Sequence, residues 1–294
     1  MTDDLGLFGP GSVSWRVHRE PVLWLAGVRA LYLQALHPRA VAGVVQNSDI
    51  RRNCWPRLMR TAEYVGTVVY GTTDQAERAG RRVRRIHDRL RAHDPRTGEE
   101  FRVDDPQLLR WVHVTEVESF VSTARRARIG LSDADVDRYY AEQTRAAALV
   151  GLDPGTVPAS AAEVAEFYRS IRPELALTAE ARDAARFLTL PPMPARYAVA
   201  GRPAWLGLAA MAVALLPRWA RRLYRLPGLP TTDVAASLTV LGLRGLINAL
   251  PVREGPIYRD AMRRAEAAAR PESDAAAASP RRDARAAGRD LLPR

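Results

Sequence analysis

The sequence predicts an all-α protein built as a single bundle of many helices. Apolar residues recur at intervals of three and four positions along nearly the whole chain, which is the spacing of a helix with a buried face. No segment combines the period-two alternation of a strand with the turn residues of a hairpin. With 294 residues, of which 47% are hydrophobic, the chain is long enough to bury a substantial core.

The N-terminal part of the chain predicts four helices. Pro38 ends or kinks the first of them, because proline lacks an amide hydrogen and clashes with the preceding turn. Pro56 suits the first turn of the second helix, where that hydrogen has no partner within the helix. The four predicted helices span 22–36, 55–70, 74–93 and 106–125.

Helices continue through the C-terminal part. Ser132 is followed three positions later by Asp135, a capping-box pattern in which each side chain accepts a hydrogen bond from the other residue's backbone amide. A helix is therefore predicted to begin directly after Ser132. Further helices are predicted at 161–171, 178–188, 204–224, 232–250 and 256–269.

The apolar period stops near Pro271. Beyond it the chain consists mainly of Ala, Arg, Ser, Asp and Pro, a composition that cannot bury enough apolar surface to fold. We therefore expect one all-helical domain over 1–270 and a disordered tail over 271–294.

All 44 basic residues are arginines, and the net charge is +11. A strongly basic protein can bind nucleic acid or an anionic membrane surface. Here acidic residues are mixed among the arginines, and no sustained basic stripe alternates with aromatic residues, so a nucleic-acid partner is not expected. The single cysteine, Cys54, excludes an internal disulfide, a Cys-x-x-Cys zinc site and a covalently attached c-type haem.

The first residues lack the basic and apolar regions of a signal peptide, so we expect a cytoplasmic location. Residues 204–216 form an uninterrupted run without a polar side chain, but a membrane-spanning helix needs about 20 residues. A buried core helix is the expected role of this run. Because several arginines follow at 218–225, a peripheral contact with a membrane surface through 204–225 is the alternative.

Three histidines lie where they could serve a functional site. His87 borders a helical apolar stripe, and His113 faces inward between apolar residues four positions before and after it. His37 directly precedes Pro38 at a helix break. On spacing alone, a histidine that is hydrogen-bonded at or in the core is favoured at each position over a metal ligand or an acid/base group.

Arg57 and Thr61 are four residues apart and share one helical face. On spacing alone they are best explained as a surface arginine and a threonine bonded to its own backbone. Competing sites are poorly supported, because Glu116 and Glu118 diverge by about 200° on a helix. The Glu-x-x-His signature of a di-iron site, the Gly-x-Ser-x-Gly nucleophile elbow and a phosphate-binding glycine loop are all missing.

Three segments nevertheless form a recognisable pattern together: Leu36-His37-Pro38, the run 57–61 (Arg-Leu-Met-Arg-Thr) and Arg85-Ile86-His87. The chain resembles, over approximately 20–250, the catalytic domain shared by latex-clearing rubber oxygenases and MpaB-type oxygenases. That resemblance implies a b-type haem held inside an all-helical bundle. It also implies an oxygenase that uses dioxygen on an apolar, isoprenoid or lipid-like small molecule, by oxidative cleavage of a carbon–carbon double bond.

The resemblance also implies roles for individual residues. His87 matches the axial iron ligand, with His113 as the second choice, and Arg57 and Thr61 match residues next to the haem. An arginine can bind a propionate through two hydrogen bonds, and a threonine hydroxyl can donate to bound dioxygen. His37, Arg60 and His113 are further candidates for the catalytic side of the pocket. Arg60 departs from the lysine of the rubber oxygenases, and an arginine cannot shuttle a proton because it stays charged.

Two other functions remain open from the sequence. One is a helical protein that binds haem or a lipid without catalysis. The other is an arginine-rich protein that binds a membrane surface or nucleic acid and has no cofactor.

Overall fold

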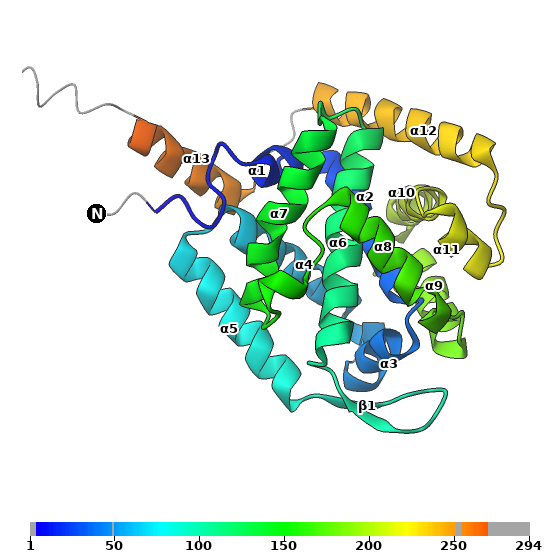
Figure 1. Ribbon diagram of the computed structural model, residues 1–294. Coiled ribbons are helices and arrows are strands. Elements are labelled where there is room, and N and C mark those ends of the chain that lie inside the picture. Colours follow the sequence, from blue (N-terminus) through cyan, green and yellow to red (C-terminus); the bar gives the residue numbers. More distant parts are fainter. Residues whose placement is uncertain (1–3, 49, 251–254, 270–294) are drawn as a thin grey trace, which may run out of the picture.

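The computed structural model describes residues 4–48, 50–250 and 255–269, which form a mostly helical molecule (Figure 1). The predicted helical class is confirmed, with the addition of one small hairpin. Up to the middle of the chain the elements are α1 (Val13–His18), η1 (Pro21–Leu23), α2 (Trp24–Gln34), α3 (Pro38–Asn47), α4 (Ile50–Tyr70), α5 (Thr73–Arg89), β1 (Arg91–His93), β2 (Glu100–Arg102) and α6 (Pro106–Arg126).

The second half of the described chain is helical throughout. Its elements are α7 (Asp133–Leu149), η2 (Pro154–Thr156), α8 (Ala161–Ile171), η3 (Arg172–Glu174), α9 (Ala179–Thr189), α10 (Ala195–Ala214), α11 (Arg218–Leu223), α12 (Pro230–Ala249) and α13 (Pro256–Ala269). The predicted tail over 271–294 lies outside the described residues, and the extent of the domain over 1–270 stays a prediction.

Helix α2 lies at the centre of the bundle and packs against α6, α9 and α10. Most of its side chains are apolar and buried, so it is covered on several sides. Its buried Arg29 is only 1% exposed and is neutralised by Glu118 of α6, whose Oε2 lies 2.6 Å from Nη1. The Nε–H of Arg29 also donates to the Leu215 carbonyl at 3.0 Å. This arginine therefore ties α2 to α6 and to the end of α10.

The hairpin was missed by the sequence prediction. The helix predicted over 74–93 ends at Arg89, and His93 belongs to β1, which pairs antiparallel with β2. Each strand has three residues and turns only its middle one inward, Ala92 opposite Phe101. A period of two cannot be recognised in a strand that buries a single side chain.

Other boundaries also differ from the prediction. Pro56 lies inside α4 and not in its first turn, because the helix already begins at Ile50. The adjacent Trp55 holds this part of α4 in place: its indole N–H donates to the Pro192 carbonyl at 2.8 Å, and its ring meets Trp205 edge-on. The short helices α1 and α3 were not predicted.

The helix predicted over 204–224 is divided between α10 and α11, with Pro217 at the N-cap of α11. The apolar run at 204–216 serves largely as a core helix: Ala209, Ala212, Leu215 and Leu216 are buried. In the part of the chain that the structure describes, no helix is long and apolar enough to cross a membrane.

The predicted capping box at the start of α7 is confirmed. Ser132 Oγ accepts from the Asp135 amide at 3.1 Å, and Asp135 Oδ2 accepts from the Ser132 amide at 3.1 Å. The helices predicted at 106–125, 161–171, 178–188, 232–250 and 256–269 correspond to α6, α8, α9, α12 and α13 within one or two residues.

Candidate functional site

Helices α4 and α5 form a hairpin that carries the central part of the predicted site. Only Gly71 and Thr72 separate them, and Thr72 caps α5 in a capping box with Gln75. Arg57 lies 13 residues before the end of α4, and His87 lies 14 residues after the start of α5. At 1.5 Å per residue both are about 20 Å from the turn, so the hairpin places them opposite each other. The positive charge of Arg57 indeed acts on the His87 imidazole.

Close contact between α5 and α7 fixes the position of α5. Gly80 faces the end of α7, where a Cβ atom on this glycine would come within 2.7 Å of the Leu149 carbonyl oxygen. Only glycine allows the two backbones to approach this closely. His87 follows two turns later on the same helix, so its position depends on this contact.

His87 is partly buried, and its ring forms no hydrogen bond with any residue that the structure describes. Its Nδ1 atom is completely enclosed and still has no partner. Burial lowers the pKa of His87, the Arg57 charge lowers it further, and Asp104 opposes the shift. The ring is therefore neutral at physiological pH and keeps a nitrogen lone pair, as a metal-ligating histidine must.

Arg57 and Arg60 are neighbouring arginines on one side of α4. The pKa of Arg57 is lowered by burial and by the neighbouring Arg60 charge, which shows that the two guanidinium groups are close. Neither forms an ion pair with an acidic residue in the described ranges. A ligand with two carboxylates, such as the propionates of haem, would satisfy both.

Thr61 is exposed, and its hydroxyl donates to the Arg57 carbonyl at 3.1 Å. Its hydrogen is therefore used within α4, as expected from the spacing alone. A role for Thr61 beside a cofactor requires this hydroxyl to rotate away from its own helix.

Helix α6 contributes a second group of polar side chains. His113 and Glu116 are three residues apart on one face, and the Glu116 charge acts on Tyr64 of α4. Burial lowers the pKa of His113 to about 4 and raises the pKa of Glu116 to about 7. Both groups are half-buried, and burial is the cause of both shifts.

His37 has a structural setting of its own. It is the N-cap of α3, and its Nδ1 accepts from the Ala40 amide at 3.4 Å. Its Nε2 lies 3.6 Å from Glu174, and its ring lies 6.1 Å from that of Trp111. Burial, reinforced by nearby arginines, lowers its pKa to about 4. None of these contacts joins it to His87 or Arg57, so its catalytic role stays a prediction.

Two residues were missed by reasoning from the sequence. Glu116 was weighed only as a partner of Glu118, although its spacing from His113 already placed it on that histidine's face. Tyr64 lies seven residues after Arg57 and three after Thr61, so it belongs to the same face of α4. These helical spacings were the signals in the sequence that could have identified Glu116 and Tyr64.

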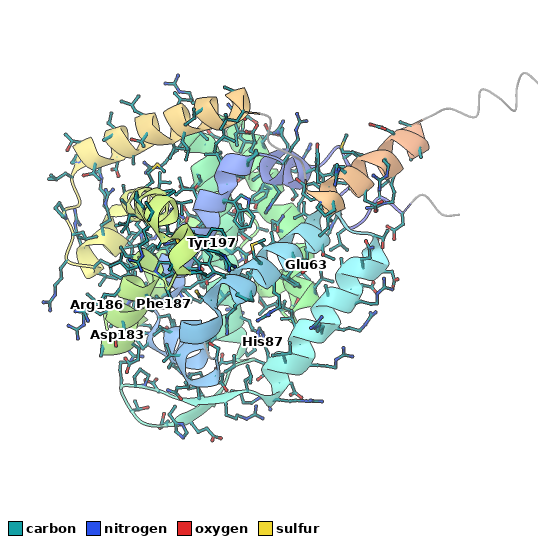
Figure 2. The ribbon with its side chains drawn as sticks, turned by 180° about the vertical axis from the view of Figure 1, so that it is seen from behind. Glu63, His87, Asp183, Arg186, Phe187 and Tyr197 are labelled. Carbon is teal, nitrogen blue, oxygen red and sulfur yellow. The ribbon has the colours of Figure 1, made fainter. Side chains whose placement is uncertain are left out.

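Two surface cavities lie apart from these residues. One, of about 420 Å³, lies between α4, α5 and α13 and is lined by Glu63, Gln75 and Asp260 among others. The other, of about 450 Å³, lies beside α9 at Arg186 and Phe187. Figure 2 shows His87 on α5 beside α4, well separated from Arg186 and Phe187. Neither cavity includes a residue of the predicted site.

A comparison with protein families decides the assignment. The model of the family described as "ER-bound oxygenase mpaB/B'/Rubber oxygenase, catalytic domain" matches residues 15–250. The chain belongs to this oxygenase family. No curated protein and no solved structure matched the chain.

The residues of this MpaB/rubber-oxygenase domain fit a haem better than a bare metal ion. Within the described ranges no group of three or more His, Cys, Asp or Glu side chains could hold a metal. Haem needs only one or two protein ligands for its iron, because the porphyrin supplies four nitrogens. An imidazole without a partner among the described residues, as at His87, could ligate a haem iron, and two neighbouring arginines such as Arg57 and Arg60 could bind its propionates.

Proposed function

We propose that this chain is a b-haem-dependent oxygenase that acts on an apolar small molecule. The observation that carries the proposal is the pairing across the α4–α5 hairpin. On α5, the His87 ring has no hydrogen-bond partner among the described residues and feels the charge of Arg57 on α4, and Arg60 lies close to Arg57. Family membership supports the oxygenase class.

His87 would ligate the iron, and Arg57 and Arg60 would bind the propionates. Haem, when bound, supplies dioxygen activation, while the protein supplies ligation, orientation and a site protected from water. Because Arg60 keeps its proton, it can anchor an anion but cannot pass a proton to the reaction. Proton transfer must therefore come from another residue.

Glu116 is the best candidate for that proton transfer. Its pKa of about 7 lets the carboxyl hold or release a proton near neutral pH, as a general acid or base requires. His113, one turn away with a pKa of about 4, stays neutral and can orient a ligand by a hydrogen bond. We place both on the catalytic side of the pocket, and Thr61 and His37 remain secondary candidates.

An apolar substrate is supported by the family to which the chain belongs. The family that matches the chain includes the rubber oxygenases, whose name specifies an apolar polyprenyl substrate. The double bonds of a polyprenyl chain can take up both atoms of dioxygen to give two carbonyl products. We propose this reaction, oxidative cleavage of a carbon–carbon double bond, as the activity.

The cofactor is tested by an absorption spectrum of protein produced with a haem precursor, before and after reduction, together with a pyridine haemochrome assay. We expect a Soret band and a b-type haemochrome from the wild-type protein. We expect His87→Ala to lose haem and keep its helical content, with His93→Ala as a control on the exposed strand β1. Full haem occupancy in His87→Ala would show that His87 is not the ligand and would favour His113. A colourless wild-type protein would refute the proposal.

The propionate role and the reaction need separate measurements. If Arg57 binds a propionate, Arg57→Ala loses a charge-assisted hydrogen bond and should release haem to apomyoglobin about tenfold faster. Arg82→Ala, which removes an exposed arginine of α5, is the control for comparison. An unchanged release rate would remove Arg57 from the propionate site. Oxygen uptake with polyprenols, and detection of carbonyl products, tests catalysis. Haem binding without oxygen uptake would identify a haem-binding protein without this activity.

A further inference from the structure

The outer face of helix α12 carries no charged side chain, whereas a helix face in water usually does. Its exposed residues are all uncharged, and they include Val234, Leu238 and Leu246, which are 61%, 63% and 61% exposed. The exposed residues of α5, by contrast, are mostly arginines and acids. Figures 1 and 2 both show α12 along an outer edge of the molecule, and no other described helix covers its outer side.

The two charged residues of α12 point inward. Asp233 binds Arg221 at 2.6 Å and Arg218 at 2.7 Å, and Arg244 binds Glu20 at 2.8 Å. Ala236 and Val240 are buried against the rest of the bundle. The inner face of the helix is therefore fully packed, and its apolar outer face contributes nothing to the packing of the residues that the structure describes.

The loop before α12 also exposes apolar residues, and exposed arginines lie next to them in the sequence. Leu226 and Leu229 are exposed in this loop. Arg222 and Arg225 are exposed beside them and form no ion pair within the described part of the chain. An apolar helix face bordered by free arginines has the composition of a segment that lies in the interface of an anionic membrane.

We propose that the outer face of α12, with Arg222 at the end of α11 and Arg225 in the loop that follows, docks on an anionic lipid surface. Helix α12 is about 30 Å long and lies on the bilayer without crossing it. Its leucines and valine enter the headgroup boundary, and the arginines bind lipid phosphates. A second copy of this chain fits less well, because two arginine-bordered faces on proteins of charge +11 repel each other.

The proposal does not depend on haem or on catalysis, and it is tested on the full-length protein by cosedimentation with vesicles. The probes are phosphatidylcholine vesicles and vesicles that also contain phosphatidylglycerol. We expect binding to the anionic vesicles that weakens as salt is raised. Leu238→Glu combined with Leu246→Glu should lower the partition coefficient at least about tenfold, because a charge enters the apolar face.

A matched control separates this effect from a general change of charge. Ala134→Glu combined with Ala141→Glu adds the same two charges at exposed positions of α7 and should leave most of the binding intact. Arg222→Gln combined with Arg225→Gln should weaken binding to anionic vesicles about fivefold per arginine and leave binding to neutral vesicles unchanged.

Three outcomes would overturn the proposal. The first is a wild-type protein that does not sediment with anionic vesicles, and the second is an equal loss of binding in the α7 control. The third is a dimer by light scattering that the Leu238 and Leu246 substitutions dissociate, which would make a second copy the occupant of this face. Circular dichroism of each variant confirms that its helices are retained.

Discussion

The buried carboxyl of Glu116 gives the sharpest prediction about the candidate site. Burial raises its pKa to about 7 in the folded protein, from the 4.5 of a solvated glutamate. Between these two pH values the native state holds a proton that the unfolded chain has released. Stability must therefore fall as the pH rises through this window.

The size of the effect follows from the two pKa values. A difference of one pKa unit corresponds to about 1.4 kcal/mol, so raising the pH from about 5 to 8 should cost the native state about 2.5 kcal/mol through Glu116 alone. Glu116→Gln replaces the carboxyl with an amide that cannot ionise. The free energy of unfolding of this variant, relative to wild type, should therefore increase by about 2.5 kcal/mol over the same pH range.

Urea unfolding followed by circular dichroism at both pH values measures this difference. Burial lowers the pKa values of His18, His37 and His113, which therefore reduce stability on acidification, but they do so equally in both proteins and cancel. Glu77→Gln, at an exposed carboxyl of α5, is the control and should show no such change. The difference in unfolding free energy between Glu116→Gln and wild type should increase with pH. A difference that is independent of pH, or that decreases as the pH rises, would refute both the burial of Glu116 and its proposed proton transfer.

Three further predictions concern the parts of the fold that position the site. Arg29→Met should lower the free energy of unfolding in urea by about 3–5 kcal/mol, because Glu118 is left as an unpaired, largely buried charge. Adding Glu118→Leu should recover most of that loss, and a double variant less stable than the single one would contradict this reasoning. Gly80→Ala should cost about 1–3 kcal/mol, since its Cβ collides with the end of α7, and a neutral effect on the melting temperature would show that α5 and α7 can separate freely. His37→Ala should cost about 1 kcal/mol by removing the cap of α3, whereas His37→Asn, which can still cap, should lose less in the same unfolding assay.

Most of the helices could be predicted because each contains several turns and a local boundary signal. The capping box at Ser132 and the prolines at the first positions of α6 and α13 are local signals, and they define the starts of those helices within a residue or two. The strands could not be predicted, because their pairing depends on Ala92 meeting Phe101 across a loop. The start of α4 was also missed, because a proline inside a helix resembles a proline at its beginning.

The candidate site residues Arg57, Thr61 and His87 were selected by the family resemblance and not by spacing, and their roles stay predictions. The two-residue turn between α4 and α5 brings Arg57 close enough to act on His87, whereas the Thr61 hydroxyl bonds within α4. The pKa of Glu116 arises from protein that surrounds it on several sides, including Tyr64 from a distant part of the sequence. No local pattern contains that information, so the carboxyl most suited to proton transfer became evident only in three dimensions.

The relative positions of the two proposed sites limit what membrane docking could do. Figures 1 and 2 are related by a turn about the vertical axis, which preserves height, and in both α12 lies at the top, whereas the end of α5 with His87 lies in the lower half. A molecule resting on α12 would thus hold the His87 region away from the bilayer. Docking would then tether the enzyme without delivering a membrane lipid directly to the haem. Turnover of a short, soluble prenyl substrate should therefore be the same with and without anionic vesicles. Strong stimulation by vesicles would instead require the substrate to enter from the α12 side of the bundle.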